Sequence, residues 1–261
     1  AHHLGAAMHQ RVFEYFTPKF CLGMTATPER TDNFNVYKLF NYDIAYEIRL
    51  QDALEENMLC PFHYYGVEDY EINGEVIDDA TELTRLTSEE RVNYIIKQTK
   101  YYGYSGDKLH GLIFCSRKEE AKALAELLTQ RGYRSVALTG EDSIARRDEV
   151  VLQLERGEID YIVTVDIFNE GIDIPCVNQV VMLRNTESSI VFIQQLGRGL
   201  RKFKDKEYVT IIDFIGNYKN NYLIPIALTG DKTHSKDSAR DSVDLEPIYG
   251  TSMINFTKIA K

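Results

Sequence analysis

The chain has 261 residues, of which 44% are hydrophobic, so it carries enough apolar side chains for one large domain or two modest ones. Its formal net charge of −10, from 40 acidic and 30 basic residues, argues against a wholly basic nucleic-acid-binding domain but leaves room for a local basic groove. No apolar run approaches the ~20 residues that a membrane helix needs, and the first residues lack the pattern of a signal peptide. We therefore expect a cytoplasmic protein without a membrane partner.

Neither a disulfide framework nor a metal site is expected. The chain has four cysteines, which are far apart in the sequence and form no C-x-x-C pair: Cys21, Cys60, Cys115 and Cys176. His2 and His3 are adjacent, but no third ligand follows at a recognisable spacing.

The amino-terminal part begins with one expected helix and one expected strand. Residues 5–16, GAAMHQRVFEYF, have the apolar spacing of a helix, and residues 20–27, FCLGMTAT, have the pattern of a buried strand that ends in small hydroxylated residues. One helix and one strand are too few to fold alone, so we expect the chain to begin inside an α/β domain.

Residues 70–109 are polar and contain one clear helical pattern. Thr87 and Glu90 have the spacing of a capping box at the start of this helix. The side chains expected on its buried face are Val92, Ile95, Ile96 and Thr99.

From residue 110 onward the sequence alternates strand and helix patterns. Residues 111–116, GLIFCS, are a continuous apolar run, typical of a strand buried on both faces. Further strands are expected at residues 133–140, 159–165, 179–184 and 207–214, and helices at residues 116–132, at residues 142–157 and from about residue 188. This order predicts an α/β fold, a doubly wound parallel sheet flanked by helices. Ligands of such sheets bind at the loops that leave the carboxyl ends of the strands, here after residues 116, 139, 165 and 184.

Two of these helices carry end signals. Ser116 and Glu119 have the spacing of a capping box, and the helix at residues 142–157 has a cap near Asp142 or Ser143 and a stop at Gly157. The expected buried stripe of the first helix consists of Ala121, Leu124 and Leu128.

Three loops carry polar residues without an obvious packing role. In QQLGRGLR, residues 194–201, Arg198 and Arg201 are three apart and Gln194 lies one turn earlier, an arrangement that suits phosphoryl oxygens. A basic helix end that complements the helix dipole would have the same pattern. In TVDIFNEGIDIP, residues 164–175, Gly171 and Asp173 suit either a nucleotide contact or an Asx-type turn.

The third loop is GMTATPER, residues 23–30. Thr25 and Thr27 flank an alanine at the end of the expected strand. Their small hydroxyl groups would either relay hydrogen bonds between two ligand sites or cap the next segment.

Taken in order, AHH, GMTATPER, GLIFCSR, TVDIFNEGIDIP and QQLGRGLR resemble successive motifs of superfamily 2 DEAD/DEAH-box helicases. The chain is most similar to the bacterial group related to type III restriction-enzyme helicase subunits, over about residues 1–230. The resemblance implies a RecA-like, P-loop NTPase-type fold. The implied division is a remnant of the first RecA-like domain at residues 1–60, a linker strand and small helical insertion at 61–109, the second (helicase C-terminal) RecA-like domain at 110–230, and a polar linker and arm at 231–261.

The resemblance also implies ATP and Mg²⁺ as cofactors of a longer protein. AHH resembles the end of a DEAH box, whose metal-binding Asp and catalytic Glu would precede residue 1, and the phosphate-binding motif G-x-x-x-x-G-K-[ST] is absent from this chain. We therefore expect the chain alone to have little or no ATPase activity.

The matched positions have implied catalytic roles. Arg198 and Arg201 would reach the γ-phosphate, with Arg201 as the arginine finger, and His2 would couple the metal box to Gln194. Gln194 stands where many DEAD-box relatives have histidine, which fits the DEAH-like side.

Other matched positions have implied binding and coupling roles. Gly171 and Asp173 would meet the ribose of ATP or the arginines, and Thr25 and Thr27 would link hydrolysis to movement of the strand. The residues implied along the nucleic-acid backbone are Ser116, Arg117, Thr139, Gly140 and Thr164.

The leading hypothesis is that the chain is part of an ATP-dependent helicase or translocase. It would supply the arginine-finger half of the ATP site and half of a groove for single-stranded nucleic acid, with DNA as the expected type and an amino-terminal RecA-like domain as the partner. The alternative is a catalytically inactive RecA-like module that binds nucleic acid or protein. An unrelated Rossmann-type enzyme is disfavoured because no G-x-G-x-x-G follows residues 111–116.

Overall fold

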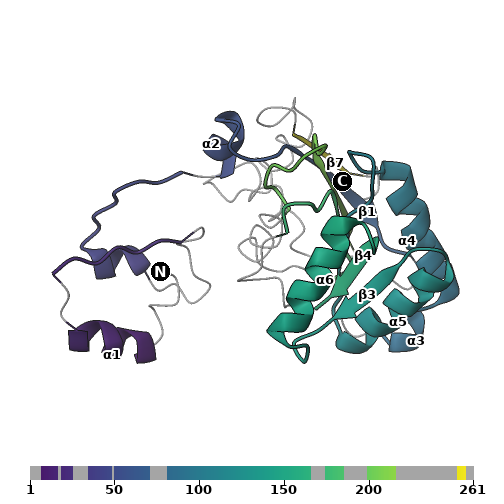
Figure 1. Ribbon diagram of the computed structural model, residues 1–261, viewed down its shortest axis with the longest axis horizontal. Coiled ribbons are helices and arrows are strands. Elements are labelled where there is room, and N and C mark those ends of the chain that lie inside the picture. The colour runs from purple at the N-terminus through teal and green to yellow at the C-terminus, as the bar shows by residue number, and fades with distance from the viewer. Residues whose placement is uncertain are drawn as a thin grey trace.

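The computed structural model describes residues 7–16, 19–25, 35–48, 50–70, 81–165, 174–184, 199–215 and 252–256. Seven strands in these ranges form one sheet in the order β3-β4-β2-β5-β6-β1-β7, and all six neighbouring pairs are parallel (Figure 1). The strands are β1 (Phe62–Glu68), β2 (Gly111–Phe114), β3 (Ser135–Leu138), β4 (Tyr161–Thr164), β5 (Gln179–Met182), β6 (Val209–Ile215) and β7 (Met253–Phe256). The predicted parallel α/β fold is therefore confirmed.

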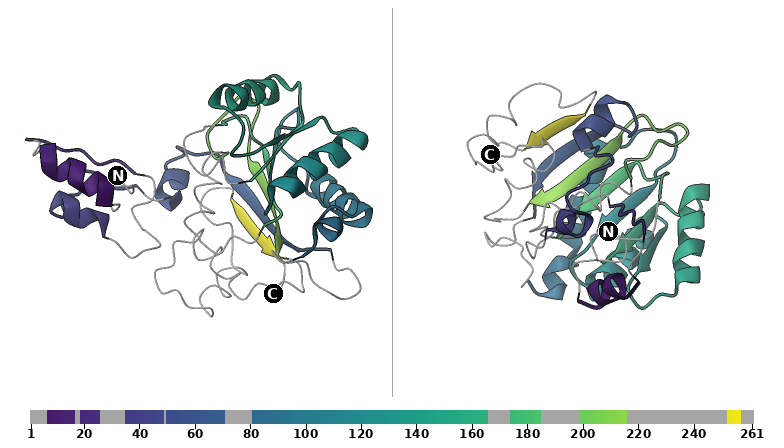
Figure 2. Two further views of the ribbon diagram at one scale, coloured as in Figure 1. Left: turned by 90° about the horizontal axis from the view of Figure 1, so that it is seen from below. Right: turned by 90° about the vertical axis from the view of Figure 1, so that its left-hand side faces the viewer.

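The helices of the described ranges are α1 (Ala7–Phe16), the 3₁₀ helix η2 (Val36–Phe40), α2 (Leu50–Glu55), α3 (Leu83–Leu86), α4 (Glu89–Tyr102), α5 (Lys118–Gln130) and α6 (Ile144–Arg156). Helices α1 and η2 lie to one side of the sheet and its flanking helices (Figures 1 and 2). Among the helices that the structure describes, none has the length and apolar character of a membrane span.

Two hydrophobic clusters lie on opposite faces of the sheet, because successive side chains of a strand point to opposite faces. In β2, Leu112 and Phe114 face the cluster that contains Val150 and Leu154 of α6. Ile113 faces the other cluster, which α4 and α5 complete (Figure 1). Helices thus cover both faces, as right-handed crossovers between parallel strands require.

The predicted strand at residues 20–27 is wrong over the part that the structure describes. Residues 20–25 have no regular structure, and Phe20 and Met24 are 79% and 77% exposed. Within the described ranges, no strand pairs with this segment, and a strand forms stably only beside others. The helix predicted just before it is confirmed as α1.

Helix ends were predicted with mixed success. Ser143 caps α6 by accepting from the amide of Arg146, and Gly157 ends that helix in the left-handed conformation, as predicted. At α4 the cap is Ser88 and not Thr87, because the Thr87 hydroxyl donates instead to the carbonyl of Leu83 in α3.

The predicted capping box of α5 is also wrong. The cap position is Arg117, whose side chain makes no capping hydrogen bond. The predicted box pairs Ser116 with Glu119, whereas the amide and hydroxyl of Ser116 donate to the carboxylate of Glu120, four residues later. The predicted buried stripe of Ala121, Leu124 and Leu128 is confirmed.

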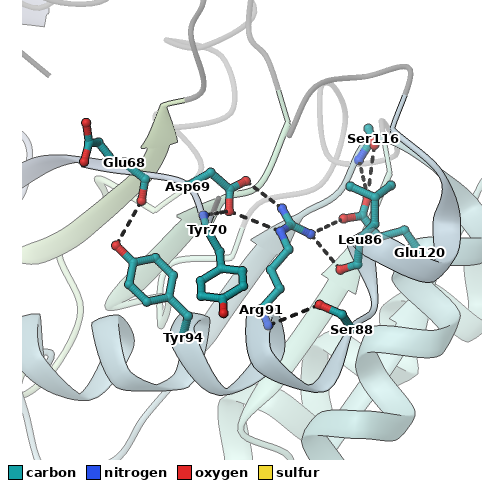
Figure 3. A network of polar contacts seen from close by, with 9 residues as sticks. All are labelled: Glu68, Asp69, Tyr70, Leu86, Ser88, Arg91, Tyr94, Ser116 and Glu120. Atoms are coloured by element: carbon teal, nitrogen blue, oxygen red, sulfur yellow. Dashed lines mark hydrogen bonds and ion pairs between the residues drawn. The ribbon is translucent and has the colours of Figure 1, made fainter. Parts of the chain in front are cut away.

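Arg91 is fully buried at the junction of β1, α4 and α5. Its Nε and Nη2 atoms donate to the two carboxylate oxygens of Asp69, just after β1, at 3.2 and 2.9 Å. Its Nη1 atom donates to Glu120 of α5 at 3.0 Å and to the carbonyl of Leu86 at 2.8 Å (Figure 3). Burial opposes the charge of Arg91, but the two carboxylates outweigh burial and raise the pKa of the guanidinium above its ordinary value. The sequence did not predict this cluster, nor that β1 lies between β6 and β7 in the sheet.

Asp213 is buried away from the Arg91 cluster, on the face of β6 that meets Tyr64 of β1. The Tyr64 hydroxyl donates to Asp213 Oδ2 at 2.6 Å. Burial raises the pKa of Asp213 to about 7, although the bond from Tyr64 partly opposes this shift. Burial and the neighbouring Asp213 raise the pKa of Tyr64 well above its ordinary value.

We expect Arg91→Met to lower the free energy of unfolding by about 3–5 kcal/mol, because two buried carboxylates lose their cation. Arg134→Met is the matched control: Arg134 pairs with Asp160 at 2.6 Å, but its side chain is 57% exposed, so the expected loss is under about 1 kcal/mol. Urea unfolding of both variants measures the difference, and equal losses would contradict the prediction.

We expect the carboxyl of Asp213 to make stability fall as pH rises. Its folded pKa lies above its unfolded value of 3.8, so the folded state holds the proton more tightly and loses this advantage between about pH 4 and pH 7. Asp213→Asn cannot ionise, so its stability relative to the native chain should increase from pH 5 to pH 8, by an amount on the order of a few kcal/mol. Urea unfolding at both pH values tests this, and a parallel pH dependence of the two proteins would refute it.

Candidate nucleic-acid interface at the carboxyl edge of the sheet

The carboxyl ends of the strands meet at one edge, because all pairs are parallel. Phe114 at the end of β2 is in register with Thr164 of β4 and Met182 of β5, and Leu138 of β3 is also in register with Thr164. The chain leaves β2 outward to β3 and returns through β4 before it crosses to β5 on the other side of β2. This reversal is the topological switch point at which open α/β sheets bind ligands.

The structure brings together part of the predicted site. Ser116, Arg117, Thr139, Gly140 and Thr164 follow or end adjacent strands at this edge. Arg201 lies in the segment before β6, and Thr25 lies in the irregular segment that follows α1. Six predicted site residues fall outside the described residues: His2, Thr27, Gly171, Asp173, Gln194 and Arg198.

Ser116 is held by the buried Arg91 cluster. Its amide and its hydroxyl both donate to Glu120 Oε2, at 3.1 and 3.0 Å. The other oxygen of Glu120 accepts from Arg91, and Glu120 is fully buried (Figure 3). The loop after β2 therefore has a fixed position relative to β1, α4 and α5.

Thr139 has the same donor pattern with a different carboxylate. Its amide donates to Asp142 Oδ2 at 2.7 Å and its hydroxyl donates to the same oxygen at 3.2 Å. The amide of Asp142 donates back to the carbonyl of Thr139 at 3.1 Å, which closes the loop before α6. Thr139 is only 1% exposed.

Gly140 is the open position of this loop. A Cβ atom added there would meet nothing within 4 Å, so a ligand has room to approach the backbone. Arg147 of α6 donates from Nη2 to the carbonyls of Thr139 and Gly140, at 3.4 and 3.1 Å.

Thr164 is fully buried at the end of β4. Its hydroxyl has no hydrogen-bond partner among the residues that the structure describes. A buried hydroxyl without a partner is costly, so the segment that follows β4 or a ligand would stabilise it.

Lys206 anchors the segment that carries Arg201. Its ammonium donates to the carbonyls of Pro175 and Val177, before β5, and of Gly199, two residues before Arg201. The amide of Cys60 donates to the carbonyl of Leu200, which adds a second tie to the same segment. A lysine ammonium has three donors, and Lys206 uses all of them on backbone carbonyls.

Sequence reasoning missed three residues at the carboxyl edge, namely Arg91, Glu120 and Asp142 as a hydrogen-bond partner of Thr139. It also missed Lys206, which lies at the amino edge of the sheet. Glu120 and Asp142 lie four and three residues after the hydroxyl residues that they bind, a spacing that in hindsight indicates such a contact. The carbonyl partners of Lys206 lie up to 31 residues away, so no local pattern indicates them.

Family models match two parts of the chain. The model of the helicase conserved C-terminal domain matches residues 90–203, and the model of the type III restriction enzyme res subunit matches residues 1–30. The first match contains β2 to β5 and the loops of the carboxyl edge.

Among curated relatives, IRC3 of Saccharomyces cerevisiae, named as an ATP-dependent helicase, is 25% identical over 272 residues, which cover 99% of this chain and 39% of IRC3. A 51.5 kDa protein of a Lactococcus phage is 26% identical over 227 residues (83% of this chain, 48% of the relative). UvrABC system protein B of Fervidobacterium nodosum is 34% identical over 168 residues (62% of this chain, 23% of the relative). The chain thus spans less than half the length of each of these relatives.

Two solved structures share the fold. The fragment structure of an HsdR-type subunit of a type I restriction enzyme from Vibrio vulnificus YJ016 superposes with a TM-score of 0.63 at 21% identity, covering 96% of this chain and 46% of that one. Dbp5 of S. cerevisiae bound to RNA and ADP BeF3 superposes with a TM-score of 0.54 at 16% identity, covering 98% and 57%. The match of residues 90–203 to the helicase conserved C-terminal domain, together with the match of residues 1–30 and the helicase relatives, supports a superfamily 2 helicase fragment.

Proposed function

We propose that this chain is part of a longer, DEAH-like ATP-dependent helicase or translocase. In this proposal, residues 1–60 are the end of a first RecA-like domain, and residues 61–109 lead into the second domain at residues 110–230 and add β1 to its sheet. Residues 231–261 form an arm, of which Met253–Phe256 pairs with β1 as β7. The observation that carries the proposal is the helicase C-terminal domain match, which spans the loops that meet at the carboxyl edge of the sheet.

Single-stranded nucleic acid would bind along this edge, through the loops after β2, β3 and β4. The open backbone at Gly140 and the nearby Arg117 suit contacts to phosphates, which fix position without reading sequence. DNA is the substrate we propose, with the amino-terminal RecA-like domain completing the groove.

ATP would bind between the two RecA-like domains. Arg198 and Arg201, with Gln194, would reach the γ-phosphate from this side, and Gly171 and Asp173 would lie beside the ribose. Lys206 supports this role for Arg201, because it fixes the backbone at Gly199 against the residues before β5.

The described part of the chain brings together no three metal-ligating side chains. Mg²⁺, which would neutralise phosphate charge during hydrolysis, would therefore be held by ATP and by the other domain, in which His2 and the residues before it would lie. Thr25 and Thr27 would couple that domain to movement along the nucleic acid.

We expect Arg201→Ala to lower ATP turnover about 10³-fold or more in a protein that joins this chain to its amino-terminal RecA-like domain, since an arginine finger stabilises the charge of the transition state. Lys204→Ala is the matched control, because it removes a neighbouring cation that is 87% exposed and lies 4.0 Å from Asp205. Steady-state ATP hydrolysis measures both variants. Near-native turnover of Arg201→Ala would refute the finger assignment, and absence of turnover in the unmutated protein would favour the inactive binding module.

A further inference from the structure

Thr139 cannot bind a phosphate in the conformation that the structure shows. A phosphodiester oxygen only accepts hydrogen bonds, so Thr139 would have to donate through its amide or its hydroxyl. Both of these donors are bound to one oxygen of Asp142, and Thr139 is 1% exposed. A phosphate can therefore reach Thr139 only if Asp142 leaves.

The two donors of Ser116 are likewise both bound to one carboxylate oxygen, that of Glu120. Glu120, however, is held far more firmly than Asp142. Glu120 is fully buried, and it also accepts from Arg91, which is itself fully buried. Moving Glu120 away from Ser116 would leave a buried carboxylate oxygen without a hydrogen-bond donor. The free-energy cost of this state is several times that of a carboxylate oxygen exposed to water. Asp142 is only half-buried, so its carboxylate can turn into solvent.

The loop of Thr139 has other supports that remain when Asp142 turns away. Arg147 holds the carbonyls of Thr139 and Gly140. Glu141 pairs with Lys118 and Lys122 of α5, at 3.0 and 3.6 Å. The donors of Thr139 would thus keep their position and become available, with the open side of Gly140 next to them.

We propose that Asp142 is a built-in competitor of the nucleic-acid phosphate for the two donors of Thr139. Binding is an exchange in which the Asp142 carboxylate moves to solvent and a phosphate oxygen takes both hydrogen bonds. Ser116 stays bound to Glu120 and acts as an anchor of its loop. This inference rests on the proposed nucleic-acid function and adds that Asp142 sets the resting affinity.

The test measures binding of the full 261-residue chain to fluorescein-labelled single strands of 20 thymidines or 20 uridines by fluorescence anisotropy at fixed salt. Asp142→Ala is expected to tighten binding about fivefold, because the phosphate no longer competes for Thr139. Urea unfolding of Asp142→Ala checks that the variant remains folded. Asp148→Ala is the matched control: it removes the same charge from an exposed position of α6 and reports the general loss of repulsion.

The Thr139→Val background locates the effect. The gain of Asp142→Ala beyond that of Asp148→Ala should shrink when the hydroxyl of Thr139 is absent. The inference is overturned if Asp142→Ala binds no tighter than Asp148→Ala, or if its excess gain is unchanged in Thr139→Val. If Asp142→Ala binds a strand and the native chain and Asp148→Ala do not, the inference is supported. If neither the native chain nor any variant binds either strand, the proposed nucleic-acid function and the inference are both overturned.

Discussion

The ion cluster around Arg91 is the interaction on which the carboxyl edge depends. One guanidinium joins the residue after β1, the last turn of α3 and the first turn of α5. A cation removed from water needs carboxylates and carbonyls as hydrogen-bond partners, and here two acids and one carbonyl accept four hydrogen bonds from Arg91. Since Glu120 also receives both donors of Ser116, the geometry of the cluster continues directly into the loop after β2.

Two loops have the same hydrogen-bond pattern but differ in how deeply the accepting carboxylate is buried. In each, the amide and hydroxyl of one residue donate to a single carboxylate oxygen a few residues later. Glu120 cannot move without stranding a buried charge, whereas Asp142 exchanges a hydrogen bond to Thr139 for hydrogen bonds to water. The same hydrogen-bond pattern therefore gives a rigid anchor after β2 and an exchangeable contact after β3. The difference comes from the desolvation of the carboxylate, which is complete for Glu120 and partial for Asp142.

The sequence predicted elements that depend on local patterns and missed contacts that depend on the tertiary fold. The continuous apolar runs that became β2 and β5, and the cap and stop of α6, follow from residues close together in the chain. Arginine is ordinarily solvated, and the burial of Arg91 depends on Asp69, 22 residues earlier, and on Glu120, 29 residues later. The segment at residues 20–25 has a strand pattern, but a strand needs a neighbour, and apolar sequence cannot supply one. The order of the motifs predicts a site, and that prediction did not include the carboxylates of Glu120 and Asp142.

Lys206 extends this reasoning to segments that lack regular structure. Pro175, Val177 and Gly199 belong to no helix or strand. One ammonium binds the carbonyls of all three and joins the residues before β5 to the backbone at Gly199, with Leu200 tied in addition to Cys60. A carboxylate partner in place of the carbonyls would fix only one side chain, whereas three carbonyls fix the path of two backbones. Lys206 thus positions main chain at the amino edge of the sheet, before β5 and β6, whereas Arg91 positions carboxylates at the carboxyl edge.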